Sequence, residues 1–73
     1  PAGDNWNIRV TSPSAGNGTL SIFDIEGRLV LERSVQFTGN TQVIEVHKHL
    51  RSGTYLVELR GNDFTAHKTL IRR

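Results

Sequence analysis

The side chains best suited to chemistry in this chain are three histidines and a few carboxylates. His47 and His49 are two residues apart, and Glu45 precedes His47 by two, so on an extended strand all three lie on one face. Neutral imidazole is a common ligand of zinc and copper, and His67 is a candidate third ligand. However, no carboxylate has the spacing of a zinc site, and nothing in the sequence brings His67 to the pair. We therefore interpret these residues as surface histidines at a strand end and predict no metal and no cofactor.

A second candidate is the pair Asp24 and Glu26, on either side of Ile25. A glycosidase needs two carboxylates facing each other across a cleft, about 5–9 Å apart, and calcium needs roughly six to eight oxygen ligands. So small a chain cannot build the cleft, and two local carboxylates do not complete a calcium site. We predict a tight hairpin turn instead. Asp24 would accept hydrogen bonds from the backbone amides ahead of it, and Gly27 would take the positive φ that closes the turn.

No other segment indicates catalysis. The serines lack a Gly-x-Ser-x-Gly elbow, and the run Gly16-Asn17-Gly18 lacks the lysine of a phosphate-binding loop. The chain has no cysteine, so neither a disulfide framework nor a cysteine-based metal site is available. We predict that the protein is not an enzyme.

Length and charge narrow the class of protein further. A chain of 73 residues forms one domain, and nine basic and seven acidic residues are interleaved, giving a formal net charge of +2. Nucleic-acid binders carry a concentrated basic stripe, so we expect no nucleic-acid partner. No apolar run reaches the roughly 18 residues of a membrane span, and no signal peptide opens the chain. Because Pro1 is not a natural start, we expect the domain to be excised from a longer secreted protein.

The secondary structure follows a period of two, which is typical of half-buried strands. Strands are predicted at residues 5–10, 19–24, 28–37, 41–47, 54–60 and 64–71, with turns between them, including the small polar segment 11–18. Residues 47–53 are predicted to cross from one sheet to the other. Short strands with frequent turns predict an all-β fold, a small Ig-like antiparallel β-sandwich of six to seven strands.

The alternation also predicts which side chains form the core. Leu20 and Ile22 share one face of their strand. The odd-numbered apolar residues of the next strand are predicted to face the core: Leu29, Leu31, Val35 and Phe37. Arg33 interrupts that face, so we expect a bulge or a sheet edge nearby.

One alternative function stays open on aromatic side chains. Small sandwiches that bind sugars present coplanar aromatic rings, and most rings here alternate into predicted core positions. Trp6, between two asparagines, is the exception, and whether it is exposed and binds a ligand is not fixed by the sequence. A carbohydrate-binding or spacer module of an extracellular enzyme is therefore the alternative.

Four segments, in this order, resemble one family. They are Pro1 to Val10 at the start, Leu20 to Val30 around the predicted hairpin, the residues Leu50, Gly53, Tyr55 and Leu59 in the next strand and its lead-in, and Lys68, Leu70 and Ile71 at the end. The chain resembles the C-terminal sorting domain (type A) of proteins exported by the type IX (Por) secretion system of Bacteroidetes. It departs from the family pattern at Trp6, where an aliphatic residue is usual, and at Arg51, where proline is frequent.

The resemblance implies a targeting function. Residues 1–73 would be a single C-terminal sorting domain on a cargo protein that crosses the periplasm and then reaches the cell surface or the medium. Outer-membrane translocon components would recognise the domain, and a sortase-like surface peptidase would then remove it.

The resemblance also suggests roles for single residues. The last strand would pair with a receptor strand by β-augmentation, and its cations would steer it toward an acidic receptor. The predicted recognition residues are Lys68, Leu70, Ile71, Arg72 and Arg73. The motif residues expected to be structural are Pro1, Asp4, Asp24, Gly27, Gly53 and Tyr55; Gly53 would serve a turn and Tyr55 a corner hydrogen bond. Edge strands in so small a domain also predict weak self-association.

Overall fold

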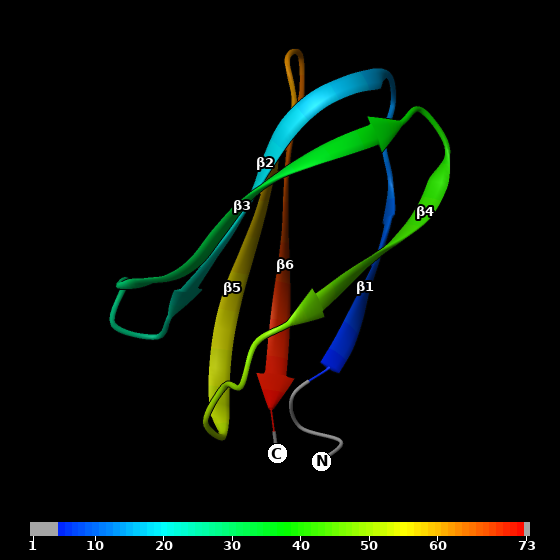
Figure 1. Ribbon diagram of the computed structural model, residues 1–73. Coiled ribbons are helices and arrows are strands. Elements are labelled where there is room, and N and C mark those ends of the chain that lie inside the picture. The colour runs from blue at the N-terminus through cyan, green and yellow to red at the C-terminus, as the bar shows by residue number, and fades with distance from the viewer. Residues whose placement is uncertain (1–4, 73) are drawn as a thin grey trace.

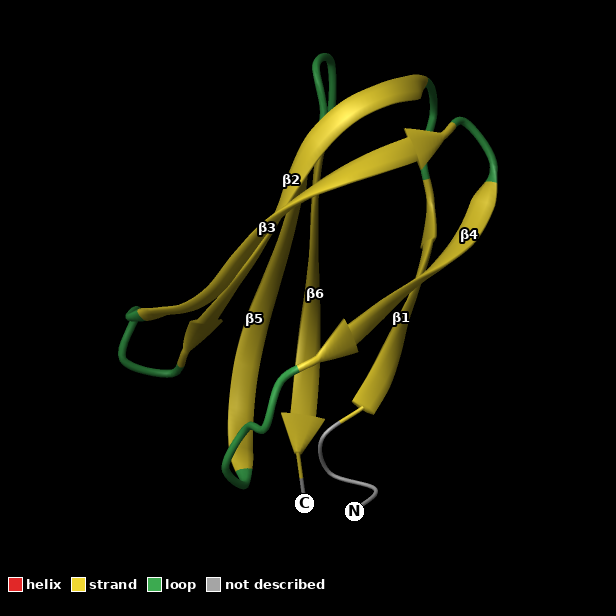
Figure 2. Cartoon of the chain, in the orientation of Figure 1, coloured by secondary structure: helices red, strands yellow, loops and turns green. Residues whose placement is uncertain are grey.

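The computed structural model describes residues 5–72, with side chains from Asn7 onward, and shows six antiparallel strands (Figure 1, Figure 2). The strands are β1 (Asn5–Thr11), β2 (Ala15–Asp24), β3 (Leu29–Thr38), β4 (Thr41–His47), β5 (Gly53–Arg60) and β6 (Thr65–Arg72). They confirm the predicted all-β sandwich, with six strands in the described part of the chain. The described residues contain no helix that could span a membrane.

The strands form two sheets. The larger has the order β3-β2-β5-β6, and the smaller pairs β1 with β4. The chain therefore changes sheets three times, and the segment from His47 to Gly53 makes the last crossing, as predicted. In Figure 1, β1 and β4 lie apart from the β2–β5 pair, and β6 runs at the side of the larger sheet nearest β1.

The core lies between the two sheets and takes alternate side chains from their facing surfaces. Leu20 and Ile22 of β2 are fully buried, as the alternation predicts. The buried apolar residues are Ile8, Val10, Leu20, Ile22, Phe37, Ile44, Val46, Leu50, Tyr55, Val57 and Leu59. Burying each large aliphatic side chain contributes about 1.5–3 kcal/mol, so the domain depends on this one cluster.

The prediction that Leu29 of β3 faces the core is wrong. Leu29 is 52% exposed, because the register shifts where Ile22 pairs with Leu31 but Phe23 pairs with Leu29. Val30 is the extra residue of this β-bulge, and it packs against the core in place of Leu29. The bulge reverses the inward–outward alternation at the start of β3. Phe37 is buried, and Leu31 and Val35 pack against the core, as predicted.

The predicted turn at residues 11–18 is also partly wrong. Residues from Ala15 to Gly18 belong to β2 and pair with β3, with Ala15 opposite Thr38 and Gly18 opposite Val35. The small residues that suggest a turn have a packing role here, because the ring of Phe37 lies directly against Gly18. The turn is confined to the residues between β1 and Ala15.

Candidate recognition surface

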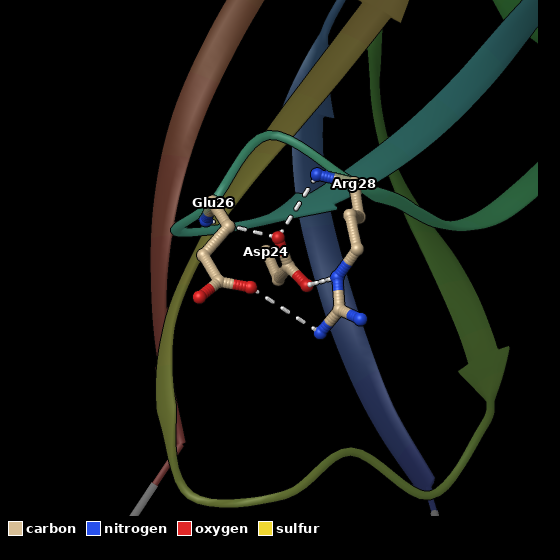
Figure 3. Close-up of polar contacts among 3 residues, drawn as sticks. All are labelled: Asp24, Glu26 and Arg28. Carbon is tan, nitrogen blue, oxygen red and sulfur yellow. Dashed lines mark hydrogen bonds and ion pairs between the residues drawn. The ribbon is translucent and has the colours of Figure 1, made fainter.

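The hairpin between β2 and β3 is organised by Asp24 (Figure 3). Oδ1 of Asp24 accepts hydrogen bonds from the amides of Glu26 and Arg28, each at 2.9 Å, and Oδ2 accepts one from Nε of Arg28 at 2.8 Å. The Gly27 amide donates to the Asp24 carbonyl, and Gly27 has a φ of 89°. The predicted turn is confirmed in both parts, the carboxylate that caps amides and the glycine that closes the loop.

These contacts lower the pKa of Asp24. The largest cause is the hydrogen bond from the Arg28 backbone amide; desolvation opposes it, and the Arg28 side chain and the Glu26 amide add to the lowering. Each of these donors favours the charged carboxylate over the protonated acid. The carboxylate is therefore the form that holds the hairpin closed.

Acid is expected to loosen this hairpin. A carboxyl whose pKa is lower in the folded state adds stability above its unfolded pKa, and that stability is lost as the pH falls through the folded value. The loss should begin below the ordinary pKa of 3.8 and finish below the lowered value. We expect Asp24→Asn, which keeps one acceptor oxygen but no charge, to melt at a lower temperature than wild type at pH 7 and to converge with it in strong acid.

The matched control for this measurement is Glu26→Gln. Glu26 lies 3.6 Å from the Arg28 guanidinium, and both side chains are about three-quarters exposed, at 73% and 76%, so this contact is worth little. We expect its melting curve to follow wild type from pH 7 to pH 2. A wild-type acid dependence in Asp24→Asn would contradict the assignment to Asp24.

Tyr55 makes the predicted corner hydrogen bond. Its side chain is 8% exposed, and its hydroxyl donates to the Arg51 carbonyl at 2.8 Å. This bond ties the crossing from β4 to the first strand residues of β5. Gly53, at the start of β5, has a φ of 150°, which favours glycine at this bend. Both residues therefore shape the return of the chain to the larger sheet, as predicted.

The predicted recognition strand, β6, is an outer strand of the larger sheet. Its side chains divide between two faces. Leu70 pairs with buried Tyr55 and packs against the core, whereas Ile71 is 59% exposed on the outer face. Arg72 pairs with Gly53 and is half-buried. The predicted residues Pro1, Asp4 and Arg73 lie outside the described residues.

Lys68 holds β6 to the other sheet. It pairs with buried Val57, so its side chain starts from the inner face, and its ammonium donates to the Arg9 carbonyl on β1 at 2.5 Å. Arg33 holds β3, at the opposite side of the larger sheet, to the smaller sheet. It pairs with buried Leu20, so its side chain also starts from the inner face, and its guanidinium donates to the Glu45 carbonyl on β4 at 2.8 Å. β3 is the other outer strand, which confirms the edge predicted from Arg33.

The histidines do not gather at one place. The His47 ring contacts Glu45 at 3.1 Å, as expected of neighbours on one strand face, while the His67 ring contacts Glu58 of β5 at 3.2 Å. Among the described residues, no group of three histidine or carboxylate side chains is placed to hold a metal ion.

The aromatic side chains pack mainly in the interior. Phe37 is 2% exposed and meets Phe64 edge-on, with ring centroids 4.9 Å apart. Phe64 and Phe23 are half-buried, and Tyr55 is part of the core. The side chain of Trp6, on which the sugar-binding alternative depends, lies outside the described side chains.

The fold and these contacts define a class of protein: a small β-sandwich domain. A capped hairpin and a tyrosine corner stabilise it, and the last of its six described strands is a basic outer strand. A sequence model of the family described as the secretion system C-terminal sorting domain matches residues 1–73, and the chain belongs to this family. Searches of curated proteins and of solved structures return no match.

Membership fixes the function in outline. The domain is a C-terminal sorting signal of type IX secretion, and the family is one of sorting signals rather than catalysts. A sorting domain implies attachment to a cargo protein and interaction with the secretion machinery. It directs that cargo to the cell surface or the medium.

Proposed function

We propose that residues 1–73 form a single domain at the C-terminus of a larger secreted protein, that outer-membrane components of the type IX translocon recognise it, and that a sortase-like peptidase then removes it. The match of the family over the whole chain supports this proposal most directly. The domain itself takes no part in catalysis; its partners are the cargo, the translocon and the peptidase.

The strand β6 is the proposed recognition element. It has one hydrogen-bonded neighbour, β5, in the described part of the chain, so its other edge is where a receptor strand would add. Ile71 offers an exposed apolar contact, and Arg72 and Arg73 supply positive charge for an acidic receptor. Leu70 would serve recognition indirectly, because its packing against the core holds β6 in place. Lys68 would keep the strand aligned with β1.

A secretion experiment tests the function. The domain is fused to a fluorescent reporter that carries its own inner-membrane export signal, in a type IX host with and without a working translocon. We expect the reporter at the surface or in the medium only when the translocon works. Reporter that stays in the periplasm of both strains, while the domain is folded, would overturn the proposal.

A truncation tests the role of β6. Removing residues 68–73 is expected to abolish export of the fusion, and unimpaired export would refute the role. Because the truncation also removes Leu70 from the core, melting of the truncated domain is measured in parallel. If it does not fold, the variant Arg72→Gln/Arg73→Gln, which keeps the strand, decides the question.

A further inference from the structure

A row of apolar side chains crosses the outer face of the larger sheet at the hairpin end. Leu29 of β3 pairs with Phe23 of β2, and Phe23 pairs with Leu56 of β5. On β6, Ile71 pairs with Thr54, two residues from Leu56 and on the same face. Leu29, Leu56 and Ile71 are 52%, 43% and 59% exposed, and Phe23 is half-buried. These four residues form an apolar row that spans all four strands.

The rest of this face is polar. Ser21 pairs with Glu32 on one side and Glu58 on the other, and further pairs join hydroxyl, imidazole and guanidinium side chains: Thr19–Ser34, Thr19–Arg60, Glu58–His67 and Arg60–Thr65. An antiparallel sheet that faces water normally carries such side chains over its whole outer surface. The apolar row is therefore a local departure from that pattern.

The bulge in β3 builds this row. With regular alternation, Leu29 would follow Leu31 into the core. The extra residue, Val30, turns Leu29 outward, opposite Phe23. Bulges commonly re-aim a side chain next to a functional site. This one adds an exposed leucine to an apolar surface, while Val30 packs against the core in its place.

A hollow adjoins the row. It has a volume of about 490 Å³, and its lining includes Phe23, Ile25, Leu56 and Thr69. Ile25, at the tip of the hairpin, is 81% exposed. A hollow of this size and lining suits an apolar side chain of a partner, because interface anchors fill apolar pockets of this kind.

The size and charge of the surface indicate the occupant. The exposed apolar side chains here are Ile25, Leu29, Leu56 and Ile71, between 43% and 81% exposed, whereas each side of a standard stable interface contributes roughly 20–30 residues. A second copy of the chain is thus too weakly held. Glu32 borders the row and accepts a hydrogen bond from the Ser21 hydroxyl at 3.4 Å, whereas Glu58 is paired with Arg60 and contacts His67, each at 3.2 Å. Glu32 is therefore the rim carboxylate that would repel an anionic lipid surface. A protein with a cation beside an apolar anchor fits both features.

We propose that the apolar row docks a protein component of the export machinery, which inserts an apolar side chain into the hollow and sets a lysine or arginine against Glu32. This proposal rests on the proposed function and adds to it a second recognition surface, on the outer face of the larger sheet, which shares only Ile71 with the β6 contact. The contact is transient, as an export signal requires, because the cargo must be released.

The test uses the reporter fusion in the host with a working translocon. Leu29→Thr and Leu56→Thr remove apolar surface from β3 and β5 and leave β6 unchanged, and Glu32→Lys reverses the rim charge. The matched controls lie on β4: Val43→Thr, at a side chain 53% exposed, and Glu45→Lys, at one 67% exposed. We expect each row or rim variant to reduce export at least about fivefold, as interface anchors do, while both controls export like wild type and all variants melt near the wild-type temperature.

Each alternative gives a different result. Export of the row variants at the control level, with translocon-dependent export of wild type intact, overturns this inference and leaves the proposed function standing. Failure of wild-type export overturns both. Sedimentation of the purified domain at low concentration, where the weak self-association predicted for edge strands is negligible, is expected to show monomer; a dimer that Leu56→Thr disperses would assign the row to a second copy. Binding to vesicles containing phosphatidylglycerol that Leu56→Thr abolishes would assign it to lipid.

Discussion

Replacing Gly18 by alanine is expected to lower the free energy of unfolding by about 2–3 kcal/mol, a cost typical of overpacking a tight site. A Cβ at this position would lie 2.3 Å from the Arg60 carbonyl oxygen and 2.3 Å from Cε2 of Phe37. Neither neighbour can move cheaply. The carbonyl belongs to the backbone at the end of β5, and the Phe37 ring is held in the core against Phe64. For so small a domain this is a large share of a total stability of about 5 kcal/mol.

The measurement is urea unfolding of Gly18→Ala beside Gly27→Ala. Gly27 has a φ of 89° with no atom within 4 Å of an added Cβ, so its substitution adds backbone strain alone, about 1–2 kcal/mol. Phe37→Leu in the Gly18→Ala background should recover part of the loss, because it shortens one clashing group and leaves the carbonyl. A Gly18→Ala variant as stable as wild type would show that β2 does not pack against Phe37 as described.

The period of two predicted most of the fold, because a half-buried strand must alternate. It placed the six strands, the inward face of Leu20 and Ile22, and the crossing after β4. The hairpin and the tyrosine corner were also predictable, because their contacts are local. Asp24 and Gly27 shape a turn that ends at Arg28, and the Tyr55 hydroxyl bonds the Arg51 carbonyl four residues earlier. Contacts of this kind can be predicted from the types of residues that are close together in the sequence.

The errors in predicting the strands arose where packing between residues far apart in the sequence determines the local structure. Leu29, Val30 and Leu31 are all aliphatic, so no side chain marks which one is the bulged residue. The strand residues from Ala15 to Gly18 resemble a turn until Phe37 is placed on them. Ser12 offered no local signal either, yet it is 2% exposed and its hydroxyl accepts a hydrogen bond from the Gly39 amide.

The residues of β6 that we propose for recognition show the same limit. Sequence similarity identified the last strand as a unit, but its alternation assigns the side chains to different tasks: Leu70 to the core and Ile71 to the outer face. The partner of Lys68 is a carbonyl 59 residues away. No pattern in the sequence indicates such a contact, because every residue offers the same carbonyl.

The paired contacts of Arg33 and Lys68 predict a second large effect. We expect Arg33→Thr/Lys68→Thr to lose about 1–2 kcal/mol of unfolding free energy, since each charged donor holds one carbonyl across the sheets. We also expect the variant to self-associate at concentrations where wild type is monomeric. A charge that points inward from an outer strand is a recognised obstacle to edge-to-edge pairing, because a strand added there must bury or displace it.

Net charge must be separated from position in this experiment. The double variant lowers the formal charge from +2 to zero, and a chain near zero charge associates more readily in any case. Arg51→Thr/Arg60→Thr removes the same number of positive charges from exposed positions away from the outer strands, because Arg51 lies in the connection before β5 and Arg60 lies on β5, which has neighbours on both sides. Sedimentation velocity and urea unfolding of both variants give the comparison. Equal association of the two variants would assign the effect to charge alone. Association confined to Arg33→Thr/Lys68→Thr would show that the inward cations prevent strand pairing at the edges of the larger sheet. One of these is the β6 edge, at which a receptor strand is proposed to add.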